Sequence, residues 1–126
     1  MISLLASTLI LLSATSEFAS APGADGFACV PEGMMQERNV CAFEAYKRAS
    51  NLVQREYLAT RKVQLPAERT SFASKQRRWS SDRDARCEGQ TKELEGGNAW
   101  AEVFYNCLAS ASRHRVKELR EMRVLR

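Results

Sequence analysis

The segment Lys75–Cys87 (KQRRWSSDRDARC) carries the pattern that decides the fold, because Trp79, Arg83 and Cys87 follow one another at intervals of four residues. Side chains three or four residues apart lie on the same face of an α-helix. An aromatic ring, a guanidinium group and a thiol therefore share one face of a predicted helix over about residues 66–94. The ring and the thiol favour a buried face, and an arginine buried there needs hydrogen-bond acceptors.

Two further segments, at about residues 34–62 and 99–122, have the same helical period. In the first, the residues at steps of three or four are Ala42, Ala45, Ala49, Val53 and Tyr57. In the second, they are Trp100, Val103, Phe104, Cys107, Leu108, Ala111, Arg115, Leu119 and Met122. Each segment therefore predicts an amphipathic helix.

Leu65-Pro66 and Gly96-Gly97 separate the three predicted helices. The residue before a proline avoids helical angles, and proline suits the first turn of the following helix. Glycine commonly ends a helix, and Asn98 stands where the third helix needs an N-cap. No stretch shows the alternation typical of a strand. The sequence thus predicts an all-α fold, a small antiparallel three-helix bundle in which each helix packs against the other two.

The chain of 126 residues indicates one domain preceded by a processed segment. Residues 2–14 are uncharged and mostly apolar, and they are too few to span a bilayer, which takes roughly 20 residues. They match the apolar core of a secretory signal. We predict a signal peptide over 1–21 that is cut within 16–26, a flexible leader over 22–28 and a helical domain over 29–126. The alternative is an apolar helix of a cytosolic protein, because no cation precedes the apolar run.

Four cysteines, Cys29, Cys41, Cys87 and Cys107, favour disulfides, since an even number of cysteines is typical of small exported chains. Zinc is the competing use, but no pair has the spacing of a zinc knuckle or ribbon. In one straight helix Cys29 and Cys41 would lie about 18 Å apart, too far to bond. A turn at residues 31–33 brings them together, and the glycine pair allows Cys87 to reach Cys107. We expect both disulfides, each stabilising the bundle by roughly 3 kcal/mol.

Three spaced motifs cover most of the predicted helical domain. Cys41 is followed by Tyr46-Lys47 and Tyr57, residues 76–87 contain Q-x2-W-x3-R-D-x2-C, and residues 107–119 contain C-L-x3-S-x2-R-x2-E-L. In these motifs the chain resembles the LprI-like family of bacterial exported proteins, which is named for a lysozyme inhibitor. The resemblance implies an exported binding protein that inhibits lysozyme. The motif residues are Tyr46, Tyr57, Gln76, Trp79, Arg83, Asp84, Arg115 and Leu119.

Three polar positions depart from the family pattern. Ser50 stands where the family usually has aspartate, Gln54 where it has asparagine, and Ser112 where it has threonine. If the family's aspartate accepts a hydrogen bond from an inward arginine, Ser50 offers a shorter and neutral acceptor. These departures therefore put in question the hydrogen bond between residue 50 and an inward arginine.

Arg83 and Arg115 are predicted to have their stems packed against apolar neighbours, so their guanidinium groups need acceptors. The candidates are Asp82, Asp84, Glu44, Glu118 and Ser50. Our first interpretation is structural, with Trp79 and the two arginines fixing the register of the helices. The alternative is that Arg83, Asp84 and Arg115 line a ligand groove.

Catalytic and metal sites find no support in the sequence. His114 lies between two arginines on a predicted solvated face, and no nucleophile stands near it. Asp82 and Asp84 are two residues apart, so on a helix they point to different sides and cannot act as a pair. No glycine-rich phosphate loop or cluster of metal ligands occurs. We predict a protein that is not an enzyme and has no cofactor or metal.

The formal net charge is +4, and the cations are concentrated after residue 112. The first partner hypothesis, lysozyme or another envelope protein, needs a local acidic patch, because common lysozymes are themselves basic. Glu88, Glu93 and Glu95 are the predicted patch.

The second hypothesis is an envelope-associated structural protein that binds anionic polymers or lipids through the basic C-terminal helix, with Arg120 and Arg123 as contacts. Cations near a helix C-terminus also suit the helix macrodipole, which is the simpler explanation for them. Nucleic acid is not expected as a partner, because we predict a periplasmic or secreted protein.

Overall fold

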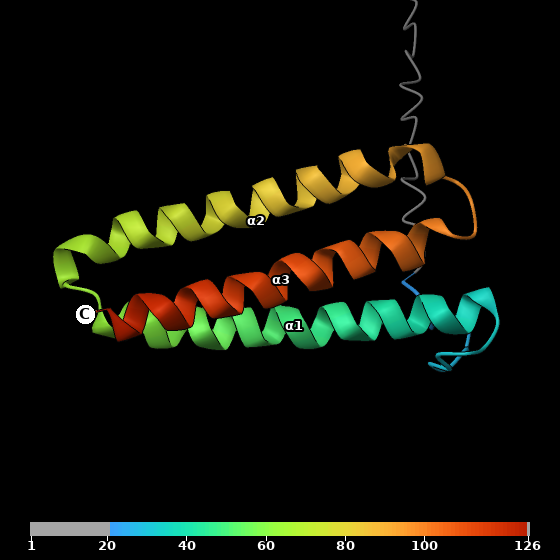
Figure 1. Cartoon of the computed structure of the whole chain (residues 1–126), viewed down its shortest axis with the longest axis horizontal. Helices are drawn as coiled ribbons and strands as arrows, with labels where there is room; N and C mark the ends of the chain where they lie inside the picture. The colour runs from blue at the N-terminus through green and yellow to red at the C-terminus, as the bar shows by residue number, and fades with distance from the viewer. Residues whose placement is uncertain (1–20, 126) are drawn as a thin grey trace, which may run out of the picture.

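The computed structural model describes residues 21–125 and contains three long helices (Figure 1). Helix α1 comprises Met35–Val63, α2 comprises Arg69–Thr91 and α3 comprises Trp100–Val124. Short 3-10 turns, η1 (Pro66–Glu68) and η2 (Lys92–Leu94), precede and follow α2. The part of the chain that the structure describes contains no strand, so the predicted all-α class is confirmed. The predicted signal segment before residue 21 lies outside the described residues.

The helix ends lie where proline and glycine predicted them. Gln64 and Leu65 are extended, with ψ angles of 145° and 142°, and Pro66 opens η1. Gly96 has a φ angle of +79°, a conformation that favours glycine, in the turn between α2 and α3.

The predicted N-cap of α3 is wrong. Ala99 occupies the cap position, and no side chain caps the first turn. The Asn98 carbonyl instead accepts a hydrogen bond of 3.3 Å from the Asn39 side chain on α1. A contact between helices has therefore taken the place of the local cap that the sequence predicted.

Helices α1 and α3 run in the same direction side by side, and α2 returns antiparallel to both (Figure 1). The central cluster consists of Val53, Phe72, Val116 and Leu119. Helix α2 packs mainly on α3 and touches α1 little. Its buried residues are Phe72, Arg83, Cys87 and Thr91, so polar groups make up half of its inner face. The expectation that each helix packs against both others is thus met unequally, because α2 has a short apolar face.

Both predicted disulfides are present, Cys29–Cys41 and Cys87–Cys107. Their Cα–Cα distances are 4.5 Å and 5.8 Å. All four cysteines are used in these bonds, so none of them is a free thiolate that could bind zinc. Within residues 21–125, no helix combines the length and the apolar character needed to cross a membrane.

The segment predicted as a leader, residues 22–28, forms backbone turns in the structure. The Ala24 amide donates to the Ala21 carbonyl, and the Gly26 amide donates to the Gly23 carbonyl. Gly23 lies close to Val40 of α1. The start of the described chain therefore lies against the N-terminal part of α1.

Candidate functional site

Two arginines flank the ring of Trp79 in the space between α2 and α3. The guanidinium carbon of Arg83 lies 5.1 Å from the ring centroid, and that of Arg115 lies 5.5 Å from it. Only 5% of Arg83 and 6% of Arg115 is exposed to solvent. Arg83 also lies 5.5 Å from the ring of Tyr46 on α1, so this residue of α2 contacts α1 as well. A cation and the face of an aromatic ring attract each other electrostatically, and burial strengthens that attraction.

The buried guanidinium groups have their acceptors. Arg83 forms an ion pair of 2.8 Å with Asp84 and donates to the Ser112 hydroxyl across 3.4 Å. Ser112, which is fully buried, in turn donates to the Leu108 carbonyl at 2.7 Å. These contacts tie the middle of α2 to the middle of α3.

Arg115 is held from the opposite direction, by a motif residue on α2. Its Nη2 and Nε atoms donate to Gln76 Oε1 at 2.8 Å and 3.0 Å, and Nη1 lies 3.4 Å from Glu118. The pairs Arg83–Ser112 and Arg115–Gln76 therefore cross the α2–α3 interface in both directions.

Of the acceptors proposed from the sequence, Asp84 and Glu118 accept. Asp82 is exposed, and Glu44 lies 3.9 Å from Arg48 on its own helix. Ser50 lines a groove of about 580 Å³ between α1 and α2 together with Arg83, but it forms no hydrogen bond with Arg83. Two other serines accept from this arginine at 3.4 Å each: Ser80 on its own helix, and Ser112 on α3, which departs from the family pattern.

The other motif residues lie in the same interior. The ring of Tyr57 stacks on Phe72 with centroids 5.2 Å apart, and Leu119 is fully buried in the central cluster. The groove that would make Arg83 a ligand contact thus exists, but the guanidinium group of Arg83 is already engaged inside the protein.

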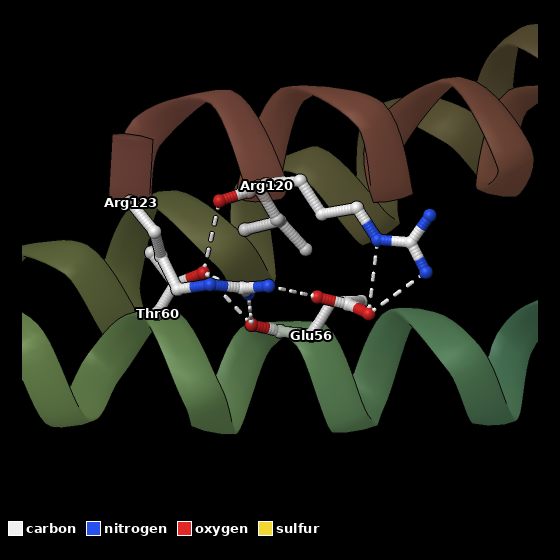
Figure 2. A network of polar contacts seen from close by, with 5 residues as sticks. Glu56, Thr60, Arg120 and Arg123 are labelled. Atoms are coloured by element: carbon white, nitrogen blue, oxygen red, sulfur yellow. Dashed lines mark hydrogen bonds and ion pairs between the residues drawn. The ribbon is translucent and has the colours of Figure 1, made fainter. Parts of the chain in front are cut away.

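Arg120 and Arg123, the predicted envelope contacts, both bind Glu56 of α1 (Figure 2). Arg120 Nη2 lies 3.0 Å from Glu56 Oε1, and Arg123 Nη2 lies 2.6 Å from Glu56 Oε2. Arg123 Nη1 also donates to the Thr60 hydroxyl at 3.1 Å, and this hydroxyl lies 3.0 Å from the Leu119 carbonyl. We call Glu56, Thr60, Arg120 and Arg123 the ionic latch, because they connect α1 to α3.

The hydrogen bond from Arg123 is the main cause that lowers the pKa of Glu56 below its usual 4.5, and Arg120 lowers it further, while burial acts in the opposite direction. The carboxylate of the ionic latch is therefore ionised at neutral pH. Nothing in the sequence marks Glu56 for this role, because its two partners follow more than sixty residues later.

The fold separates the charges of the chain along its length. Because α1 and α3 are parallel and α2 is antiparallel, residues 21–44 and 87–107 meet at one end, which we call the acidic end (Figure 1). It carries eight carboxylates and two cations, a net charge of −6. The remaining described residues, 45–86 and 108–125, carry six carboxylates and sixteen cations, a net charge of +10. The overall positive charge thus conceals two regions of opposite sign.

Glu88, Glu93 and Glu95 lie at the acidic end, all exposed and without an ion pair to any described residue. The cations there are Lys92, next to them in η2, and Arg38, which pairs with Glu102 at 3.3 Å. Several large apolar side chains are exposed at the same end. They are Phe27, Val30, Met34, Leu94 and Val103.

An aromatic cluster lies behind this surface and joins α1 to α3. Phe43 and Tyr105 meet edge to face at 4.9 Å, and Trp100 stacks on Phe104 at 4.6 Å. Burial raises the pKa of the Tyr105 hydroxyl above its usual 10.0, and Tyr46 adds to the effect. The exposed apolar residues at this end are thus supported by a packed interior. Sequence periodicity suggested that Trp100 and Phe104 face the core, but it did not predict exposed Met34 or Phe27.

His114 is exposed, as expected, and lies 3.8 Å from Glu118. In residues 21–125, no three histidine, cysteine, aspartate or glutamate side chains gather as metal ligands.

Comparison with known proteins gives one match. The family model described as "Lysozyme inhibitor LprI" matches residues 29–119. No curated protein and no solved structure matches the chain. The matched range begins at the first disulfide cysteine and ends at the buried Leu119, so it includes the Trp79 region and the acidic end except for residues 21–28.

Proposed function

The chain belongs to the LprI lysozyme inhibitor family, and from this membership we propose that it is an exported protein that binds lysozyme and blocks its action through the acidic end. The observation that supports this surface is the net charge of −6 over residues 21–44 and 87–107. Lysozymes are commonly basic, so a partner of this kind is attracted to the acidic end and repelled by the rest of the molecule.

The length of the bundle makes this attraction effective. Helix α1 has 29 residues and is therefore about 43 Å long at about 1.5 Å per residue. Charges in salt solution are screened over about 8–10 Å. A basic protein that docks on the acidic end is consequently several screening lengths from most of the cations on α1 and α3. The positive net charge of the whole chain does not prevent such a complex.

The acidic end also has the composition of a protein-binding surface. Met34, Leu94 and Val103 supply exposed apolar area, and Glu93 and Glu95 stand beside Leu94 in the turn after α2. Protein interfaces commonly have an apolar centre with a charged rim, in which the apolar contacts slow dissociation and the charges speed association. We propose that this turn covers the substrate cleft of lysozyme and excludes the substrate sterically, so that inhibition needs no covalent bond to lysozyme.

Two features support export as part of this function. Disulfides persist in oxidising compartments, and this chain has two. Residues 2–14 have the composition of a secretory signal. We therefore propose a periplasmic or secreted location, where a lysozyme that enters the envelope would be met.

The envelope-binding alternative relied on Arg120 and Arg123, which are both engaged by Glu56. An anionic polymer would have to compete with that carboxylate for the same guanidinium groups. We therefore rank the inhibitor first.

The test compares two double variants of equal charge. Glu93→Gln/Glu95→Gln removes two carboxylates from the acidic end, and Asp82→Asn/Glu121→Gln removes two exposed carboxylates elsewhere. Association with purified lysozyme and inhibition of cell-wall hydrolysis are measured at low and high salt. We expect the first variant to associate about five- to tenfold more slowly than the control at low salt, with a smaller difference at high salt.

Two outcomes would count against the proposal at different levels. If the unaltered protein neither binds nor inhibits lysozyme at either salt concentration, the function is wrong. If it inhibits but both variants behave alike, the function stands and the acidic end is not the contact surface.

A further inference from the structure

The end of the bundle opposite the acidic end has a cationic hollow that the proposed function does not use. Leu58, Arg61 and Lys62 of α1 and Arg69 of α2 line it, with a volume of about 310 Å³. Arg69 Nη2 donates to the Lys62 carbonyl at 3.5 Å, which holds its guanidinium group at the hollow. Arg61 and Lys62 are exposed and form no ion pair with residues 21–125. Three cationic side chains and one apolar side chain therefore line the same hollow.

Large apolar side chains are exposed at the same end of the bundle as this hollow. Leu58 lines it, and Val63 and Leu65 follow Lys62 where α1 ends, with 63% of Leu65 exposed. Val124 and Leu125 end the described chain at the same end of the bundle, and 86% of Leu125 is exposed (Figure 1). We call Leu58, Arg61, Lys62, Val63, Leu65 and Arg69 the basic tip.

The carboxylates near the basic tip do not cancel its charge. Glu56 is occupied by Arg120 and Arg123, as Figure 2 shows. Glu68 and Glu121 are the other carboxylates in this part of the bundle, and Lys75 and Arg55 add to the cations. The basic tip thus belongs to the region whose net charge is +10.

We propose that the basic tip docks on the surface of an anionic lipid bilayer. A lipid phosphate enters the hollow between Arg61, Lys62 and Arg69, and the side chains of Val63 and Leu65 enter the interface beside it. Cations bind acidic headgroups, and apolar side chains gain by burial at the boundary with the acyl chains. A soluble anionic polymer would engage the cations but would leave the apolar residues in water, so the combination favours a bilayer.

This arrangement is independent of the lysozyme proposal but gives it an orientation. With the basic tip on a membrane, the acidic end lies about 40 Å away, since α1 extends between them. The acidic end then remains accessible to a soluble basic protein.

The experiment is sedimentation of the full chain with vesicles. One set of vesicles contains phosphatidylglycerol and phosphatidylcholine in equal parts, and the other contains phosphatidylcholine alone. All variants share the same N-terminus, so any binding through residues 2–14 is common to them and is measured with the neutral vesicles. Circular dichroism confirms that each variant is folded.

We expect Arg61→Gln/Lys62→Gln to bind the anionic vesicles roughly twentyfold more weakly, because each cation near an anionic surface contributes a factor of about five. Its matched control, Arg113→Gln/Lys117→Gln, removes two exposed cations from the middle of α3 and should change binding less than about threefold. Val63→Ser/Leu65→Ser should weaken binding about tenfold. Its control at the acidic end, Met34→Ser/Leu94→Ser, should bind as the unaltered chain does.

Equal binding to anionic and neutral vesicles would overturn the proposal, as would equal binding by Arg61→Gln/Lys62→Gln and its control. If the cation variant loses binding while Val63→Ser/Leu65→Ser binds normally, the contact is electrostatic only. That result would overturn the entry of Val63 and Leu65 into the bilayer interface and would reduce the basic tip to a site for anions in general.

Discussion

The two ends of the bundle are stabilised by different kinds of bond. Both disulfides lie at the acidic end, where Cys29–Cys41 fixes the N-terminal turn and Cys87–Cys107 joins α2 to α3. Near the opposite end, α1 and α3 are connected by the ionic latch of Glu56, Thr60, Arg120 and Arg123 (Figure 2). Covalent bonds therefore add to the packing at the acidic end, and an ion-pair network adds to it near the other end.

The difference follows from the composition of each end. The acidic end has two cations for its eight carboxylates, so among the described residues there Arg38–Glu102 is the one ion pair, and the remaining like charges repel. A disulfide stabilises such a region whatever its charge, because it restricts the unfolded chain. The opposite end has cations in excess, and one inward carboxylate suffices to bind two of them. Because the disulfides stabilise the acidic end, most of its carboxylates can stay unpaired and available to a partner.

The largest effect is expected at the acidic end. Replacing the disulfide by Cys87→Ala/Cys107→Ala opens a loop of about twenty residues, and the free energy of unfolding should fall by about 3 kcal/mol. Urea denaturation measures the change. A loss below about 1 kcal/mol would mean that this end is held mainly by packing.

Hydrogen exchange of the same variant locates the effect. Amides near residues 87–107 should exchange faster, while the amide of the buried Thr60 should keep its protection relative to global unfolding. Equal loosening at both ends would show that the two regions unfold as one unit.

The second effect concerns the ionic latch. Glu56→Gln keeps the size of the side chain but removes the charge that binds Arg120 and Arg123, and we expect a loss of about 2 kcal/mol. Glu121→Gln, an exposed change on α3, is the control and should alter the free energy of unfolding by less than about 0.5 kcal/mol. If the two variants are equally stable, the ionic latch does not hold this end.

The smallest effect is a pH dependence specific to the ionic latch. The pKa of Glu56 is below its usual 4.5 in the folded protein, so its stabilising contribution is fully present above about pH 4.5 and is lost as the pH falls through the lowered value. The difference in stability between the unaltered protein and Glu56→Gln should therefore shrink from about 2 kcal/mol at pH 7 as the pH is lowered below about 4.5 towards about 3. Denaturation at both pH values measures it. A difference that stays constant would contradict ionisation of Glu56 as its source.

The interior around Trp79 was predicted in part. The four-residue spacing placed Arg83 on a buried face, and Asp84 and Glu118 were among the acceptors expected for the two arginines. Ser50 was expected on the basis of a family position, but Ser112 meets Arg83. The spacing of residues in α2 gives the face on which Arg83 lies, whereas the residue of another helix that it meets depends on how the helices are placed against each other.

The sequence by itself determined the local features of this protein: three helices, the breaks at Pro66 and Gly96, and the disulfide partners that the turns bring together. Helical period, proline and glycine act over a few residues, so they can be read along the chain. Only the tertiary structure decided that carboxylates from two separate segments form one acidic end and that Glu56 occupies Arg120 and Arg123. These contacts join residues more than sixty positions apart, and their partners are set by the parallel alignment of α1 and α3, which no local pattern encodes.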